Sequence, residues 1–220
     1  MTLWQDSEAV LRHSQPWSHE KGRKGVFFVK KLWIALLMLP VLLGLSTCTT
    51  VKRVPDYASQ LVDAVAEGET QRGYALAAER NALIARGVIR ETPVSYDELL
   101  LLARLIDAET GESAYGEEYR LCVGEVALNR VASPEFPDTL EAVVFQQGQY
   151  PCAQEPEFAD LRPSRACAEA ALSLLLGERR LAPQVVYQSS RQIGPAFVRF
   201  YDRRLGYTYF CESVYPELYC

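Results

Sequence analysis

One uncharged segment divides this 220-residue chain into two parts. Residues 32–46 read LWIALLMLPVLLGLS, and Arg23, Lys24, Lys30 and Lys31 precede them. The apolar residues surround the segment instead of forming one stripe, which disfavours a helix buried in a soluble core. A transmembrane helix needs roughly 20 apolar residues, and this run is shorter. A basic stretch followed by a short apolar run is typical of a signal peptide or a short membrane anchor.

The residues after the apolar run favour a lipid anchor. Residues 45–48, LSTC, resemble the bacterial lipobox, although threonine is a less usual residue before the cysteine. We expect residues 1–48 to be an N-terminal extension plus a lipoprotein-type signal, and Cys48 to be lipidated, with simple secretion as the alternative. Residues 1–25 are long for such a signal, so Val26 is an alternative start of translation. The expected location is the outer face of the cytoplasmic membrane or the cell wall.

Histidine is absent from the part that follows the signal, because His13 and His19 both precede the apolar run. Zinc hydrolases rely on histidine ligands, and serine and cysteine hydrolases rely on an imidazole base. These chemistries are therefore disfavoured together, and we expect no metal and no cofactor. Carboxylates, tyrosines and thiols remain as candidate catalytic groups.

The composition is that of an ordinary globular protein, with 49% hydrophobic and 23% charged residues. The formal net charge of −5 argues against nucleic acid as a partner, because such surfaces concentrate Lys and Arg.

Cysteines follow Cys48 at five positions, and their spacing is not that of a CxxC metal site. These are Cys122, Cys152, Cys167, Cys211 and Cys220. Export permits disulfides, and four of the five can pair in several ways. Without a histidine partner, a structural role is favoured over a catalytic cysteine.

Residues 49–94 are rich in Ala and Glu and have high helix propensity, with interruptions at Gly68 and Gly73. We expect a helical linker of one or two helices that holds the following domain, residues 95–220, away from the membrane. The alternative is that these helices pack onto the domain.

A carboxylate on the first helix of that domain is the main candidate for catalysis. Ser95 and Glu98 have capping-box spacing, which predicts that a helix begins there. At 100° per residue, Glu109 falls in the apolar arc close to Leu102 and Ile106. An ionised carboxylate is costly in such surroundings, and a protonated one is the proton donor that a glycosidic oxygen needs. In the alternative, the helix end leaves the core and Glu109 is an ordinary surface residue.

The rest of the domain reads as helices followed by short strands. The predicted helices cover about 95–110, 117–131, 138–145 and 164–177. The predicted strands cover 185–187, 197–201 and 207–210, and residues 202–206 form a hairpin turn. The fold class is therefore α+β, mainly helical, with a small C-terminal β-hairpin element. Aromatic residues that can stack on sugar rings, or pack the sheet on the helices, are Tyr150, Tyr187, Tyr201, Tyr207 and Tyr209.

Four short motifs occur in order along the domain. They are Ala108-Glu109-x-Gly111-Glu112, Leu128-Asn129-Arg130-Val131, Pro134-x-Phe136-Pro137 and Phe145-Gln146-x-Gly148-Gln149-Tyr150. Through these motifs, residues 95–210 resemble the SleB-type cell-wall hydrolases, the spore cortex-lytic family.

The resemblance implies a lysozyme-like, lytic-transglycosylase-like domain that acts on peptidoglycan glycan strands. Glu109 stands where the family has the acid that protonates the oxygen between muramic acid and glucosamine. The muramic 6-hydroxyl can then attack internally, so a second carboxylate is not required, and hydrolysis and transglycosylation both remain open. Glu112 matches a second family glutamate, which orients Glu109 or the substrate or only caps a turn. We expect Glu112, Gln149, Tyr150 and Tyr187 to bind substrate.

The sequence departs from the family pattern at three places. Residues 113–118 are a local insertion, Thr208 stands where family hairpins often have His, and residues 187–190 read YQSS where Tyr-x-Tyr-Asn is common. Sugar specificity is expected to differ if these positions bind substrate. Two other functions stay open: a non-catalytic peptidoglycan-binding lipoprotein that scaffolds a partner enzyme, and a thiol-dependent peptidase.

Overall fold

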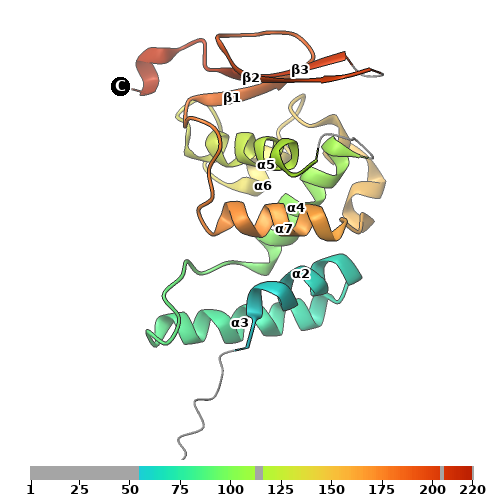
Figure 1. Ribbon diagram of the computed structural model, residues 1–220, viewed down its shortest axis with the longest axis vertical. Coiled ribbons are helices and arrows are strands. Elements are labelled where there is room, and N and C mark those ends of the chain that lie inside the picture. The colour runs from blue at the N-terminus through green and yellow to red at the C-terminus, as the bar shows by residue number, and fades with distance from the viewer. Residues whose placement is uncertain (1–54, 112–115, 204–205, 220) are drawn as a thin grey trace, which may run out of the picture. The chain divides into compact units, whose positions relative to one another are not determined.

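The structure, a computed structural model, describes residues 55–111, 116–203 and 206–219, which belong to one compact unit, Val54–Cys220. The helices are α2 (Tyr57–Glu67), α3 (Thr70–Ala85), α4 (Tyr96–Thr110), α5 (Gly116–Ala132), α6 (Leu140–Val144) and α7 (Arg165–Leu175). The strands are β1 (Val185–Ser189), β2 (Ala196–Asp202) and β3 (Gly206–Glu212). Short 3-10 helices are η1 (Pro151–Gln154), η2 (Pro156–Asp160) and η3 (Pro216–Tyr219). The predicted mainly helical α+β fold class is confirmed (Figure 1).

Helix α4 is the helix around which the others pack, since it contacts α3, α5, α6 and α7. Leu102 and Ile106 are fully buried on it, as the apolar periodicity predicts. The helix begins after Ser95, although the Ser95 side chain makes no cap hydrogen bond. The buried stripe fixes how the helix is rotated, and so fixes the direction in which Glu109, in its last turn, points.

Helix α5 crosses α4 and α7 at a glycine. A Cβ atom on Gly124 would lie 2.7 Å from Cδ1 of Ile106 on α4 and 2.6 Å from Cδ1 of Leu174 on α7. These distances are shorter than non-bonded carbon atoms tolerate. Gly124 therefore allows the three helices to approach one another closely.

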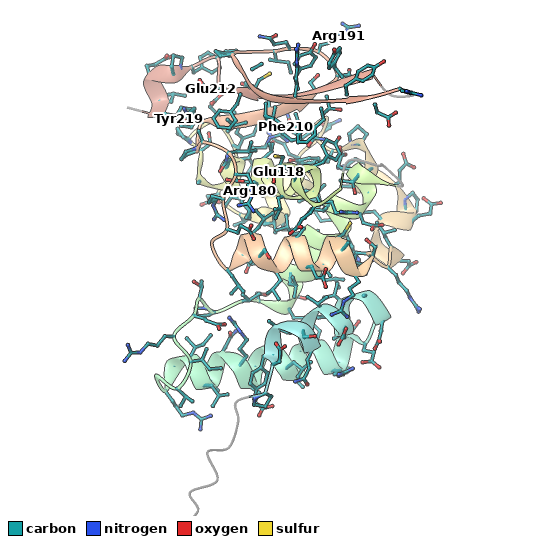
Figure 2. The ribbon with its side chains drawn as sticks, in the orientation of Figure 1. Glu118, Arg180, Arg191, Phe210, Glu212 and Tyr219 are labelled. Carbon is teal, nitrogen blue, oxygen red and sulfur yellow. The ribbon has the colours of Figure 1, made fainter. Side chains whose placement is uncertain are left out.

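The three-stranded sheet has the order β1-β3-β2 and is antiparallel throughout. Phe210 on β3 is fully buried, and its ring lies edge-on to Phe200 on β2 and to Tyr119 on α5, with centroids 5.7 and 5.8 Å away. Figure 2 shows Phe210 on the side of the sheet that faces α5. One face of the sheet therefore covers the helical core.

Two polar side chains of α5 bind the sheet to the helix. Asn129 donates from Nδ2 to the backbone oxygens of Ala182 and Val185, both at 3.0 Å. Arg130 donates from Nε to the oxygen of Val186 at 2.7 Å. Both side chains are buried, so these bonds are sheltered from competing water.

Helices α2 and α3, which fall in the stretch expected to be a linker, pack onto the domain. Helix α2 contacts α7, and Leu61 and Val65 belong to the same hydrophobic core as α4. On α3, the guanidinium of Arg80 is buried and donates to Glu91 at 2.7 Å and to the oxygen of Thr92 at 3.0 Å. The structure therefore has the packed arrangement for residues 57–85.

Within the described part of the chain, the cysteines Cys122, Cys152, Cys167 and Cys211 are unpaired thiols. Cys48 and Cys220 lie outside the described residues, as does the apolar run 32–46. None of the helices in the described ranges has the length and apolar character needed to cross a bilayer.

The helix crossing gives a first prediction. Helix propensity alone would make Gly124→Ala stabilising by about 1 kcal/mol. Because the added methyl group collides with Ile106 and Leu174, we expect a net loss of about 1–2 kcal/mol in the free energy of unfolding. Urea denaturation followed by circular dichroism measures this change. A variant at least as stable as the parent would contradict the close approach of the three helices.

Candidate active site

The carboxyl group of Glu109 lies between two segments that are distant in sequence. Its Oε1 accepts a hydrogen bond from the thiol of Cys152 at 3.1 Å, and its Oε2 accepts one from Nε2 of Gln188 at 3.3 Å. The side chain is half-buried at the end of α4. It therefore has a fixed orientation and remains accessible from solvent.

Cys152 belongs to η1 and acts as a neutral donor. Burial, together with the nearby carboxylate of Glu109, raises the pKa of the Cys152 thiol to about 12. The thiol therefore keeps its proton near neutral pH and can donate it to Glu109 as a hydrogen bond. A neutral thiol is also a poor nucleophile.

Gln188 belongs to β1, where it pairs with Phe210 of β3. Residues paired across a sheet share a face, so Gln188 lies on the face that covers the helices. Its Oε1 is buried without a hydrogen bond to any described residue. The Gln188 amide thus contacts Glu109 through its nitrogen, from the core face of the sheet.

Tyr150 and Arg130 form the wall beside the carboxyl group. Tyr150 is buried, and burial, with a further contribution from the charge of Glu109, raises the pKa of its phenol to about 12. The guanidinium of Arg130 lies 4.9 Å from the centroid of the Tyr150 ring and 5.1 Å from that of Phe136. Nη1 of Arg130 and the Tyr150 hydroxyl are buried and make no hydrogen bond of ordinary geometry with described residues. The structure therefore places Tyr150, a predicted substrate residue, beside Glu109.

Tyr187 has different surroundings. Its hydroxyl donates to Glu135 at 3.1 Å, and its ring lies edge-on to Phe136. Glu135 also accepts hydrogen bonds from Ser213 and Tyr219, so the group joins β1 to the C-terminal segment. In these contacts Tyr187 has a structural role, and its neighbour Gln188, which was not predicted, is the residue that contacts Glu109.

The other two predicted substrate residues contribute less to this geometry. Gln149 is half-buried, and its backbone N–H closes a turn with the oxygen of Gln146 at 3.1 Å. Within the described ranges, the side-chain hydrogen bonds to Glu109 come from Cys152 and Gln188, and Gln149 is not among these donors. Glu112 lies outside the described residues.

A second carboxylate of the core, Glu125, is structural. It is fully buried on α5 and accepts hydrogen bonds from the backbone N–H groups of Arg180 at 2.6 Å and Leu181 at 3.0 Å. Burial raises its pKa, and these backbone bonds partly oppose that rise. Glu125 thus holds the chain between α7 and β1 and takes no part in the site.

The carboxyl group of Glu109 is the candidate for chemistry at this site. In the described ranges, no three or more His, Cys, Asp or Glu side chains are grouped so as to hold a metal ion. Burial raises the pKa of Cys122 as well as that of Cys152 to about 12. What the geometry offers is one carboxyl group, held by neutral donors and flanked by an arginine and a tyrosine.

Comparison with known proteins identifies a family for the C-terminal region. Residues 112–210 match the family described as Cell Wall Hydrolase, and Glu109 lies three residues before the start of that match. No curated protein and no solved structure matches the chain. A domain of this family is a hydrolytic enzyme of the cell wall, whose structural polymer is peptidoglycan. Residues 112–210 thus form a domain of the SleB-type cell-wall hydrolase family.

Proposed function

We propose that this protein cleaves the glycan strands of peptidoglycan between muramic acid and glucosamine, with Glu109 as the general acid. The observation that carries the proposal is the pair of contacts on the Glu109 carboxyl group, from Cys152 at 3.1 Å and Gln188 at 3.3 Å. These contacts hold a half-buried carboxyl group at a fixed place beside the family-matched region. A general acid needs such fixed placement to reach the leaving oxygen.

The proposed reaction begins with proton transfer. The protonated carboxyl of Glu109 gives its proton to the glycosidic oxygen, and the C1–O bond breaks with its electron pair on that oxygen. The positively charged sugar is then attacked by water or by the muramic 6-hydroxyl. The Glu109 carboxylate accepts the proton of the attacking hydroxyl, which restores the acid. Hydrolysis and internal transglycosylation thus use the same residue.

The two other candidate functions have less support. A scaffold protein that only binds peptidoglycan does not need a carboxyl group held on both oxygens. A thiol peptidase needs a thiolate, whereas burial raises the pKa values of Cys122 and Cys152 to about 12. Glycan cleavage therefore remains the best-supported activity.

Glu109→Gln tests the proposed acid. The amide keeps the shape of the side chain but cannot deliver the proton, so we expect a loss of roughly 10²–10⁴-fold in the rate of muropeptide release from purified sacculi. Glu98→Gln is the matched control, because Glu98 is an exposed glutamate in the first turn of the same helix. The assignment fails if Glu109→Gln retains the parental rate. Mass spectra of the parent's products distinguish hydrolysis from formation of an anhydro sugar.

Cys152 provides a test of how Glu109 is held. Removing this donor frees one oxygen of the Glu109 carboxyl group, so Cys152→Ala should lower the rate of muropeptide release roughly 2- to 10-fold. Cys152→Ser keeps a donor at this place and should retain most of the parental rate. A parental rate in Cys152→Ala, or an equal loss in Cys152→Ser, would contradict the proposed contact.

We further propose that the enzyme is exported and tethered to the membrane by a lipid on Cys48. The support is the basic and apolar signal pattern that ends in the lipobox-like residues 45–48.

In a bacterial host that processes lipoproteins, we expect the parent to incorporate radiolabelled palmitate and to sediment with membranes. Cys48→Ser should remain unlabelled, because the acyl acceptor is gone. Cys220→Ser serves as the matched control and should be labelled like the parent. An unlabelled parent would rule out the lipid anchor and favour simple secretion.

A further inference from the structure

Three tyrosines form a row on the face of the sheet that does not cover the helices. Tyr201 on β2 pairs with Tyr207 on β3, and their ring centroids lie 4.9 Å apart. Tyr209, two residues further along β3, has its ring centroid 5.7 Å from that of Tyr207. Tyr201 is 59% exposed and Tyr207 is 42% exposed. We call Tyr201, Tyr207 and Tyr209 the tyrosine row.

The tyrosine row lies on the opposite face of the sheet from the candidate active site. Side chains alternate between the two faces along a strand. Phe200, next to Tyr201, packs against the core, and Phe210, next to Tyr209, is fully buried there. Gln188, the partner of Glu109, pairs with Phe210 and so shares the core face. A ligand on the tyrosine row would therefore be separate from the cleavage site.

The surroundings of the row are basic, although the whole chain has a net charge of −5. The described residues 190–203 contain three arginines and a single acidic residue, Asp202. The guanidinium of Arg199 lies 5.2 Å from the centroid of the Tyr207 ring. Figure 2 shows Arg191 on the side of the sheet away from α5. The row thus combines stacked aromatic rings with local positive charge.

A shallow hollow continues the row at one end. Gln192, Phe197, Arg199 and Tyr209 all line it. It therefore adds an amide and a further aromatic ring to the surface beside the tyrosines. Exposed apolar side chains that form a contiguous patch, unlike scattered single ones, are typical of interaction sites.

The chemistry of this surface matches a peptidoglycan strand. Tyrosine rings stack on the apolar faces of pyranose rings, and their hydroxyl groups can hydrogen-bond to sugar hydroxyls. Arginine binds carboxylates, which peptidoglycan carries on its muramic acid and stem peptides. A second copy of this chain fits less well, because it would place one arginine-rich surface against another.

We propose that the tyrosine row, with Arg199, is a second glycan-binding surface that holds a peptidoglycan strand apart from the cleavage site. The proposal rests on peptidoglycan being the substrate, but not on Glu109 being the acid. The role of this surface is to keep the enzyme bound to an insoluble polymer between cleavage events.

Binding of the full chain, purified in detergent, to purified sacculi tests the proposal by co-sedimentation. The parent carries Glu109→Gln, and released muropeptides are measured in parallel so that digestion is detected separately from binding. Adding Tyr201→Ala and Tyr207→Ala should weaken the apparent Kd about tenfold. Tyr74→Ala is the control, because Tyr74 is equally exposed at 42% but lies on α3.

Two further measurements identify what is bound. Replacing Tyr201 and Tyr207 by Phe should keep most of the affinity, because the rings remain. Sacculi stripped of stem peptides by an amidase should still bind the parent and still distinguish the alanine variant, because ring stacking recognises the sugars.

The proposal is overturned if the alanine variant sediments like the parent, if Tyr74→Ala loses as much binding, or if the difference disappears on stripped strands. It is also overturned if the parent forms a dimer that the alanine variant dissociates while binding to sacculi is unchanged. That result would assign the row to a second copy of the chain.

Discussion

The attachment of the sheet to α5 through buried Asn129 and Arg130 is the interaction on which the candidate site depends. These side chains bind backbone oxygens of residues 182–186 and so set the position of β1. Hydrogen bonds from a charged group contribute about 1.5–3 kcal/mol each, and a lost donor leaves a buried oxygen unpaired. Because Gln188 lies two residues beyond this attachment, the same bonds bring its amide to Glu109. Arg130 also lies over Tyr150, so one residue connects the sheet to the wall of the site.

Local sequence patterns predicted the elements well and predicted the site only in part. Apolar periodicity is a local property, and it placed Leu102 and Ile106 in the core and Glu109 beside it. The partners of Glu109 are Cys152 and Gln188, 43 and 79 residues away, and no local pattern relates them. Tyr187 was predicted from its aromatic character, but neighbouring strand residues face opposite ways. An irregularity in register between Val185 and Tyr187 makes the direction of each residue impossible to read from the sequence.

How residues 57–85 pack could also not be predicted from the sequence. High helix propensity predicts helices but does not say what their apolar faces contact. In α2, Leu61 and Val65 form a narrow apolar face that matches α7, which settles how this helix packs. In α3 the residue that could not be placed from the sequence is Arg80, because a charged side chain normally indicates an exposed position. Its burial depends on Glu91 and Thr92, which accept its hydrogen bonds from the following loop.

The neutral partners of Glu109 have a consequence for where protons travel. Burial keeps the thiol of Cys152 and the phenol of Tyr150 protonated, and no histidine follows His19 in the chain. Neither group is therefore a base that takes the proton of Glu109 at neutral pH. In the proposed reaction, the proton that Glu109 gives to the leaving oxygen is replaced by the one it takes from the attacking hydroxyl. Each turnover then returns this carboxyl group to its starting state without a second ionisable side chain.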